Sequence, residues 1–526
     1  MDDAIPVTIE MLKPSDRIDG YPSNTPKWLR KILEIFPGFF TWTLIFSPLI
    51  IAILGLYEIM VYYIAFLSVY WSYRGIRFVV GLYIAKLRTD RDIAIDWIGK
   101  IKTEFPEQYK DLKYVYICPV YREGMETLRP TIESWAESDI DTKKISVVFA
   151  LEEKFAEDEI NNFEILREEF GDKFREMIHF VHPNNIEGEV SGVKGANINW
   201  ATRNFVKMIE KRGETKQQYL LITCDSDLRP HPKYLSAITY KYFATPDRDN
   251  RFYATAIHAF NNNLWRVPPL VRTFSTTLTL VVAHSWVVTK KSKETFSSYV
   301  VNLETVHKVG YWAPDVGIDD TTFFWNALIR LDGNFSGEEV YIPTNSDAVE
   351  NESVVKTHVS LYKQQHRWGW GIIVLPSTIA ALLYNKTIPL PKKLEIFWQL
   401  LDNQILFLTV VYMITFALPL LNFFSKEFAS SSASYNLPIA MSYILTFVTF
   451  LNIPIAILKH YFMPVPKHYN WWQRIIEFVE TVLVTVNMLT FGFIPFIQAQ
   501  TELMFGKQMK KKFYATDKVA IKKQDK

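Results

Sequence analysis

Long apolar stretches lie near both ends of the chain, and a more charged region separates them. Residues 35–55 form a run of about 21 mostly apolar residues, which is enough to cross a bilayer as one helix. A second stretch covers 59–73, and two more cover 404–424 and 437–458. The pattern predicts a polytopic membrane protein with a soluble domain inserted between transmembrane helices.

Basic residues flank these stretches and indicate their orientation: Lys27, Arg30 and Lys31 before the first, Arg74 and Arg77 after the second, Lys459, His460 and Lys467 after the last. Positively charged flanks stay on the cytoplasmic side. We therefore expect a multi-pass protein of the plasma or inner membrane, with the inserted domain and both termini in the cytosol. The stretch 471–505 is apolar but interrupted by polar residues, and crossing once would place a tail with eight lysines outside. An interfacial or re-entrant helix is expected there instead.

Short apolar runs alternate with amphipathic runs in the central region. We expect strands over 114–119, 145–151, 178–182 and 219–224, and helices from about 127, over 156–175 and over 195–212. Continuously apolar strands that alternate with helices are typical of a parallel sheet covered on both faces. The pattern predicts a Rossmann-like α/β domain that binds its ligands at the carboxyl ends of the strands.

These patterns divide the chain into eight segments: a cytosolic N-terminal segment (1–34), a transmembrane hairpin (35–85), a linker (86–110), the α/β domain (111–360), interfacial helices (361–395), transmembrane helices (396–460), an interfacial or re-entrant helix (461–506) and a basic tail (507–526). Composition supports this mixture, since 49% of residues are hydrophobic and 15% aromatic while 22% are charged. The net charge of +2 gives no indication of a nucleic-acid partner. Cys118 and Cys224 lie in expected buried strands and show no zinc-binding spacing.

Asp225-Ser226-Asp227 directly follows the expected strand 219–224. Two carboxylates at a buried strand end cost free energy unless a cation or hydrogen bonds satisfy them. Mg²⁺ and Mn²⁺ prefer oxygen ligands, and Mg²⁺ commonly sits between carboxylates and substrate phosphates. We expect Asp225 and Asp227 to bind such a metal together with a diphosphate. A capping or solvated role is the alternative interpretation.

Asp319 and Asp320 immediately precede an apolar helix expected over 321–331. Carboxylates are stabilised at a helix N-terminus by free amide groups and by the helix dipole, so a purely structural role is one interpretation. The other is that Asp320 acts as a general base that takes a proton from an acceptor hydroxyl, with the adjacent carboxylate raising its pKa.

Gln364, Arg367 and Trp368 are spaced at i, i+3 and i+4, so they share one face of a helix. Arginine can neutralise a pyrophosphate leaving group, and tryptophan offers a flat apolar surface to a sugar ring. The alternative is an aromatic belt at the membrane interface, because Trp370 follows closely.

Three further positions suggest nucleotide contacts. Lys194 opens an expected helix after a Gly/Ser turn, an arrangement that binds phosphate. Tyr121 and Glu123 follow the first expected strand, and Glu152 ends the second, where a base or ribose would lie in such a sheet. The acidic side chains could equally be solvated.

Taken in order, these motifs resemble those of the family 2 membrane glycosyltransferases, the group of cellulose, chitin and hyaluronan synthases. The similarity covers about 110–370, and its most specific part is Gln-x-x-Arg-Trp at 364–368. In the tail, Phe513-Tyr514-Ala515-Thr516-Asp517-Lys518 is similar to the gating loop of bacterial cellulose synthases.

The resemblance implies a GT-A domain and a metal-dependent hexosyltransferase that uses a UDP-sugar with Mg²⁺ or Mn²⁺. It implies inversion at the anomeric carbon and processive growth of a β-linked polysaccharide, with export across the membrane lipid and room for accessory export subunits. Carried over by position, Asp320 is the base, and Asp225 and Asp227 bind the metal. The donor is held by residues matching the family motifs: Tyr121, Glu123, Glu152, Lys194, Asp225, Gln364, Arg367, Trp368, Phe513, Thr516 and Lys518.

The sequence departs from the family pattern at several places. Glu152-Glu153-Lys154 stands where the family usually has Asp-Asp-Gly, Ile318 precedes Asp319-Asp320 where the family has Thr-Glu-Asp, and Ala515 replaces a valine.

Two alternative functions are also considered. One is transfer of a single sugar to a lipid acceptor, as in a glycolipid synthase, and the other is a non-enzymatic transporter or scaffold whose domain only binds nucleotide.

Overall fold

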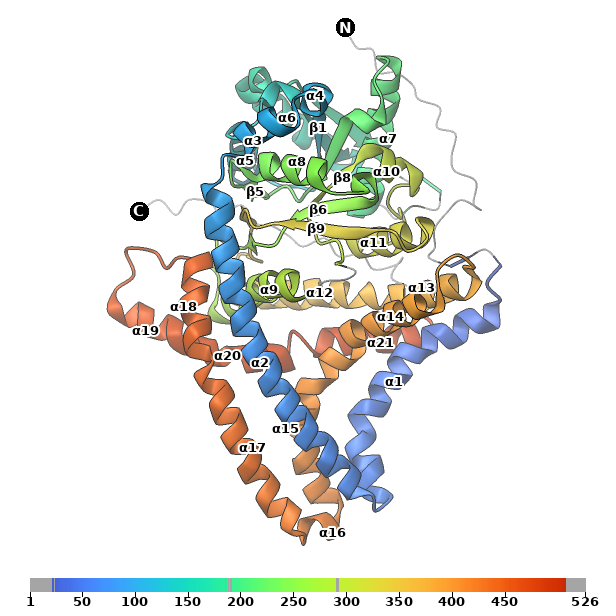
Figure 1. The fold of residues 1–526 in the computed structure, drawn as a ribbon, viewed down its shortest axis with the longest axis vertical. Coiled ribbons are helices and arrows are strands. Elements are labelled where there is room, and N and C mark those ends of the chain that lie inside the picture. The colour runs from blue at the N-terminus through green and yellow to red at the C-terminus, as the bar shows by residue number, and fades with distance from the viewer. Residues whose placement is uncertain are drawn as a thin grey trace.

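The computed structural model describes residues 21–507 apart from 23, 185, 188, 190, 191 and 290–292. Figure 1 shows three layers along the longest axis of the molecule. An α/β layer lies at one end, a layer of helices crosses beneath it, and long helices descend from there to a common tip.

The α/β layer is built on a seven-stranded sheet with the order β3-β2-β1-β4-β8-β6-β9. The strands are β1 (Lys113–Pro119), β2 (Ile145–Glu152), β3 (Glu176–His182), β4 (Tyr219–Thr223), β6 (Arg251–Thr255), β8 (Tyr299–Asn302) and β9 (Ser336–Val340). Only β8 runs antiparallel to its neighbours in this sheet. The prediction of a Rossmann-like α/β domain is confirmed, and β1 to β4 are the four expected strands.

Both faces of the sheet are buried, as the apolar strands predict. In β1, Val115 and Ile117 pack into one hydrophobic core, whereas Tyr114 and Tyr116 pack into the other, because successive side chains of a strand point to opposite faces. The expected helices are α5 (Met125–Ala136), α6 (Ala156–Phe170) and α7 (Lys194–Lys211). Helix α8 (Tyr234–Ala244) adds to the second core.

A small sheet, not expected from the sequence, follows the Asp225–Asp227 turn. It consists of β5 (Arg229–Pro230), β10 (Thr344–Asn345) and β7 (His258–Ala259), in that order. Strand β10 pairs antiparallel with β5 and parallel with β7. Three chain segments far apart in sequence are therefore joined next to the acidic turn.

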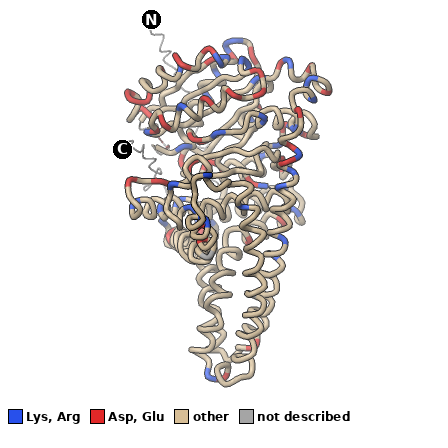
Figure 2. The backbone as a smooth tube through the Cα atoms, turned by 90° about the vertical axis from the view of Figure 1, so that its left-hand side faces the viewer, with Lys and Arg blue, Asp and Glu red and all other residues tan. Residues whose placement is uncertain are grey.

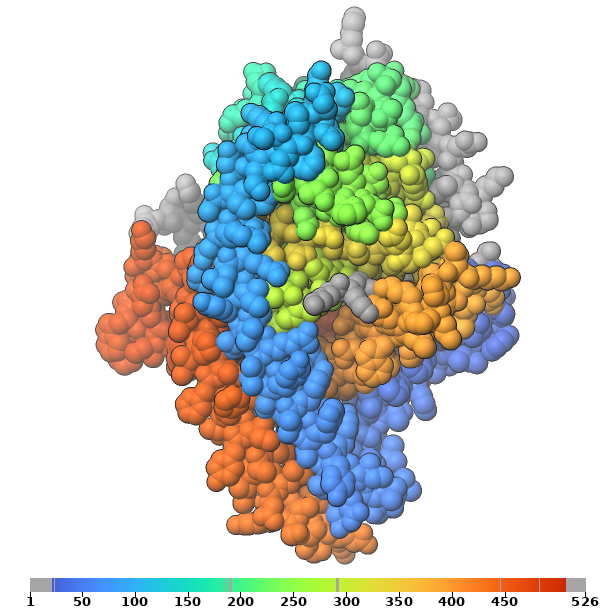
Figure 3. All heavy atoms as spheres, viewed as in Figure 1, coloured from blue at the N-terminus to red at the C-terminus, as the bar shows by residue number. Residues whose placement is uncertain are grey.

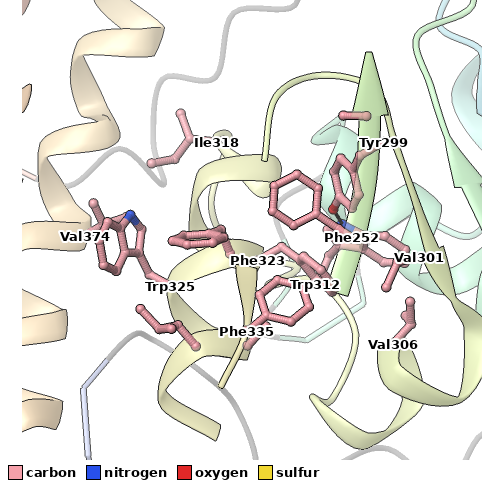
Figure 4. Packing of buried hydrophobic residues seen from close by; sticks show 14 of the residues in the cluster. Phe252, Tyr299, Val301, Val306, Trp312, Ile318, Phe323, Trp325, Phe335 and Val374 are labelled. Carbon is pink, nitrogen blue, oxygen red and sulfur yellow. Dashed lines mark hydrogen bonds between the residues drawn. The ribbon is translucent and has the colours of Figure 1, made fainter. Parts of the chain in front are cut away.

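Helix α11 (Asp319–Arg330), which begins with the two acidic residues, is anchored in the core of the sheet. Figure 4 shows Phe323 of α11 among Phe252, Trp312 and Phe335, and the Trp312 indole N–H donates to the Tyr299 hydroxyl at 2.8 Å. On the other side of this helix, Trp325 faces Val374. A helix buried on two sides can hold its N-terminal carboxylates at fixed positions.

The middle layer contains helices that run across the long axis in Figure 1. They are α9 (Pro269–Val288), α12 (Val354–Gly369), α13 (Val374–Tyr384), α19 (Trp471–Val479), α20 (Leu483–Leu489) and α21 (Ile494–Met504). The expected interfacial helix at 371–385 corresponds to α13. The 471–505 segment is broken into three short helices, and its prediction as interfacial or re-entrant stays a prediction.

The descending helices are α1 (Lys27–Ile53), α2 (Tyr57–Ala94), α14 (Leu390–Leu401) continuing through a π-helical turn (Asp402–Leu406) into α15 (Phe407–Phe424), and α17 (Ser432–Phe450) followed by α18 (Asn452–Phe462). The short α16 (Lys426–Ala429) lies at the tip. Charged residues are sparse along these helices and crowded in the α/β layer (Figure 2). The expected division into membrane-facing and soluble parts stays a prediction.

Four helical stretches in the described part of the chain are long and apolar enough to cross a membrane: Lys27–Ile53, Leu390–Phe424, Ser432–Phe462 and Trp471–Met504, the last of which comprises α19, α20 and α21 with short breaks between them. The expected second crossing at 59–73 is helical, but α2 is not among the four, and it is a single helix that continues to Ala94 across the expected boundary at residue 85. Figure 3 shows α2 at the surface from the α/β layer down toward the tip. The rest of the expected linker forms α3 (Trp97–Glu104) and α4 (Pro106–Asp111).

Candidate functional site

The acidic turn after β4 and the N-termini of α7 and α11 meet at the carboxyl edge of the parallel strands. The ammonium of Lys194, the first residue of α7, lies 2.8 Å from Oδ1 of Asp225 and donates to the Ser297 carbonyl at 3.1 Å. It also interacts electrostatically with Asp319 and Asp320. Lys194 therefore links the start of α7 to the Asp225–Asp227 turn and to the Asp319-Asp320 pair.

Lys194 and the aspartates around it shift one another's pKa values. Burial disfavours a charged lysine, but the carboxylates of Asp225, Asp319 and Asp320 outweigh it and raise the pKa of Lys194 above its usual value. Burial raises the pKa of both Asp319 and Asp320, and Lys194 opposes that rise. The site thus gathers several carboxylates around the partly buried ammonium of Lys194, and charged groups with shifted pKa values are common at functional sites.

Close packing fixes how α7 approaches α11. A Cβ atom on Gly195 would lie 2.8 Å from the carbonyl oxygen of Ala313 and 3.0 Å from Cβ of Asp319. Only glycine allows this approach, so Gly195 sets the separation between Lys194 and the two aspartates.

The two carboxylates of the acidic turn have different environments. The side chain of Asp225 is 37% exposed, whereas Asp227 is only 3% exposed and its Oδ2 accepts the amide N–H of Asp347 at 3.2 Å. Among the residues that the structure describes, no group of three or more His, Cys, Asp and Glu side chains could hold a metal ion by itself.

The donor set nevertheless suits Mg²⁺ or Mn²⁺. Two carboxylates supply the oxygen ligands that such ions prefer, and substrate phosphates commonly complete a Mg²⁺ shell. Asp225 forms an ion pair with the Lys194 ammonium at 2.8 Å. Asp225 and Asp227 would hold the metal.

The surroundings of Asp320 are compatible with both roles expected for it, a structural one at the helix N-terminus and that of a general base. Its Oδ1 accepts the amide N–H of Thr321 at 2.8 Å, which is ordinary N-terminal helix chemistry. Its backbone carbonyl accepts the Thr295 hydroxyl at 2.6 Å, and its carboxylate interacts electrostatically with Lys194 and Arg367. The role of Asp320 as a general base stays a prediction.

The 364–368 motif is helical as expected, because it forms the last turns of α12. Gln364, Arg367 and Trp368 are partly exposed, whereas Gln365 between them is buried, and its side-chain N–H donates to the side-chain Oε1 of Gln364 at 3.3 Å. Of these three residues, Arg367 interacts electrostatically with the Asp320 carboxylate.

The loop after β1 carries Tyr121 and Glu123, and its backbone is held by carboxylates. Oε2 of Glu123 accepts the Tyr121 amide N–H at 2.5 Å, and Glu159 accepts the Arg122 amide N–H at 2.8 Å. The Tyr121 ring meets Phe155 edge-on at 5.1 Å between centroids. Burial raises the pKa of Glu159 to about 7. Glu159 was not identified from the sequence.

Glu152 is buried and is held by a histidine that the sequence analysis also missed. His182 faces Glu152 at 3.3 Å through Nδ1 and Glu189 at 2.8 Å through Nε2. Burial opposes protonation of His182, but the two carboxylates outweigh it and raise its pKa to about 9. The β2–β3 register that pairs residues 152 and 182 was the missing signal. The nucleotide contact of Glu152 stays a prediction.

Three of the expected donor-binding residues cannot be placed. Phe513, Thr516 and Lys518 lie outside the described residues, so their gating role also stays a prediction.

Neither the family models nor the curated proteins contain a match to this chain. Solved structures with some similarity include a mannosyltransferase from Pyrobaculum calidifontis in complex with GDP-Man and Mn²⁺, at 14% identity and a TM-score of 0.40, covering 80% of this chain and 99% of that one. TarS from S. aureus with UDP-GlcNAc matches at 12% identity and a TM-score of 0.33, covering 73% and 93%. GalNAc-T7 with UDP, GalNAc and Mn²⁺ matches at 11% identity and 0.29, covering 57% of each chain.

Similarity at these identities and TM-scores carries no conclusion about this chain. The fold described above follows from the strand order, and the site from the side-chain contacts.

Proposed function

We propose that the chain is a membrane glycosyltransferase of the GT-A type, which transfers a sugar from a UDP-sugar with inversion at the anomeric carbon. The observation that carries the proposal is the meeting of Asp225, Lys194 and Asp320 at the carboxyl edge of the sheet. Ligands of such sheets bind at this edge. A nucleotide-diphosphate donor requires cationic groups for its phosphates and a base for the acceptor, and both lie here.

Each residue has a role that follows from its position. Lys194 and the first turn of α7 bind the diphosphate, since amide groups at a helix N-terminus favour an anion. Arg367 stabilises the negative charge that develops on the departing UDP. Asp320 accepts the proton of the attacking hydroxyl, so it acts in its ionised form. Asp225 and Asp227 bind Mg²⁺ or Mn²⁺, which when bound would neutralise charge on the donor phosphates.

The acceptor is the finer part of the proposal. The motif order favours a growing β-linked polysaccharide made at the cytosolic membrane face and exported through the helices. Transfer of one sugar to a lipid is the second candidate, favoured by the exposed apolar surfaces of the descending helices, such as Tyr62, Phe66 and Phe423. Product length separates the two, because a polymerase gives a ladder of products and a glycolipid synthase gives one.

The decisive experiment uses the full chain purified in detergent. UDP release is measured with a panel of UDP-sugars and Mn²⁺, first for the native protein and then for Asp320→Asn. The expected result is turnover with at least one donor and a loss of at least about 100-fold in the variant, the upper contribution of a general base being about 10⁴-fold.

Asp332→Asn is the matched control, because Asp332 is exposed just beyond the far end of α11. Full activity of Asp320→Asn would reject the base assignment. Absence of UDP release with every donor would reject the proposed activity.

A further inference from the structure

Three consecutive asparagines, Asn261, Asn262 and Asn263, follow β7 and face the segment that follows β10. All three bind residues between 345 and 350, but their other partners differ. Only the middle one reaches the acidic turn at which the proposed metal would bind.

Asn262 closes a ring of hydrogen bonds around Asp227. Its side-chain N–H group donates to the backbone carbonyl of Asp227 at 2.9 Å and to Oδ1 of Asp347 at 2.9 Å. The amide N–H of Asp347 in turn donates to Oδ2 of Asp227 at 3.2 Å. Both the backbone and the carboxylate of Asp227 are therefore held, and one side-chain amide connects the two restraints.

The flanking asparagines serve other contacts. Asn261 donates to Oδ1 of Asn345 at 3.0 Å and to the carbonyl of Phe462, at the end of α18, at 3.1 Å. Asn263 accepts the Ala348 amide at 2.7 Å and donates to the Ala348 carbonyl and to Glu350, each at 2.9 Å. Asn261 and Asn263 thus link the segment after β7 to residues 345–350, and neither has a hydrogen bond to Asp227.

We propose that Asn262 and Asp347 are positioning residues that fix the Asp227 carboxylate for a divalent cation bound with the donor diphosphate. The inference rests on the proposed function. A carboxylate ligand at a metal site is commonly oriented by hydrogen bonds from surrounding groups, and removing such a partner typically costs about 10- to 100-fold in metal affinity. A carboxylate that is not held in place loses conformational entropy when it binds the metal, and this loss weakens binding.

The test measures Mn²⁺ binding directly. The full chain in detergent is titrated with Mn²⁺ in the presence of UDP, and free Mn²⁺ is followed by electron paramagnetic resonance. Asn262→Ala is expected to raise the Kd for Mn²⁺ by about 10-fold or more. Asn261→Ala is the matched control and is expected to leave the Kd within about twofold, because Asn261 has comparable contacts but none to Asp227.

A kinetic measurement separates positioning from general damage to the fold. In Asn262→Ala, the Mn²⁺ concentration for half-maximal UDP release should rise while the rate at saturating Mn²⁺ recovers most of its native value. Thermal unfolding of both asparagine variants shows whether they lose similar stability. A Kd for Mn²⁺ that is unchanged in Asn262→Ala, or raised equally in Asn261→Ala, would overturn the inference.

Asp227→Asn distinguishes this failure from failure of the proposed function. If Asp227→Asn loses Mn²⁺ binding while Asn262→Ala keeps it, only the positioning role is rejected. If Asp227→Asn binds Mn²⁺ with native affinity, the metal assignment of the proposed function is rejected, and the positioning role with it.

Discussion

Replacing Gly195 with alanine should impair catalysis while the chain still folds. A Cβ atom at this position would lie 2.8 Å from the Ala313 carbonyl oxygen, about 0.6 Å short of the 3.4 Å at which ordinary contact begins. It would also lie 3.0 Å from Cβ of Asp319. Because a backbone carbonyl cannot rotate aside as a side chain can, the 313–319 loop and the start of α11 must move away from α7.

The size of the effect follows from that displacement. A misplacement of about 1 Å at a reacting group can cost about 100-fold in rate. A shift of about half that size, shared between Asp319 and Asp320, should lower kcat by roughly 10-fold or more. Overpacking costs about 1–3 kcal/mol in stability, and the better helix propensity of alanine returns up to about 1 kcal/mol. With the full helix-propensity gain, the net loss in the free energy of unfolding should be about 0–2 kcal/mol.

The assay compares kcat for UDP release with the thermal unfolding temperature of the same preparation. Gly171→Ala is the control, since its Cβ would meet only the flexible Arg167 side chain, at 3.5 Å and far from the site. Native kcat in Gly195→Ala would refute the claim that this glycine sets the distance between the lysine and the aspartates. A large loss of kcat in Gly171→Ala would show that the assay reports stability instead.

Three further predictions concern the surroundings of the site. Gly369→Ala would place a Cβ 3.0 Å from Cα of Phe496, so α12 should separate from α21 and UDP release should fall by about 10-fold, measured at saturating donor. Arg272→Met would leave the buried Glu480 without its bidentate partner, held at 2.5 and 2.9 Å, and should lower the free energy of unfolding by about 3–5 kcal/mol, measured by denaturation in detergent. Burial raises the folded pKa of Glu159 from 4.5 to about 7, so the folded chain binds an extra proton between these pH values, and this residue should lower the free energy of unfolding by up to about 3 kcal/mol as pH rises from 4.5 to 7. Unfolding measured across that range should show a weaker pH dependence in Glu159→Gln, and an unchanged dependence would contradict the assignment.

The sequence predicted the central strands well because parallel strands buried on both faces are continuous apolar runs. Strands β1 to β4 and helices α5 to α7 were found in this way. The small sheet was missed because strands of two residues, such as Thr344–Asn345, carry no pattern of their own. Helix α9 was missed because its threonines and serines, among them Thr273, Thr276 and Thr279, are buried beneath the sheet and blur the apolar period.

The site was only partly predictable, for a related reason. Lys194, Asp225 and Asp320 could be proposed one by one from their positions at strand and helix ends. Contacts such as His182 with Glu152, or Asn262 with Asp227, depend on strand register and on pairing across about 30 residues or more, which no local pattern encodes. Residues that position a functional side chain are therefore the ones most easily missed.

The contacts between layers argue that the α/β layer and the apolar helices work as one unit. Glu294 precedes β8 and accepts hydrogen bonds from Gln399 of α14 at 3.2 Å and from Asn403 of its π-helical turn at 3.1 Å. The next residue, Thr295, donates to the backbone of Asp320. A shift of α14 would thus be transmitted over two residues to the proposed base. Excising 111–360 alone would remove these anchors and the Arg367 helix together, so loss of activity in such a fragment would reflect missing positioning as much as missing membrane.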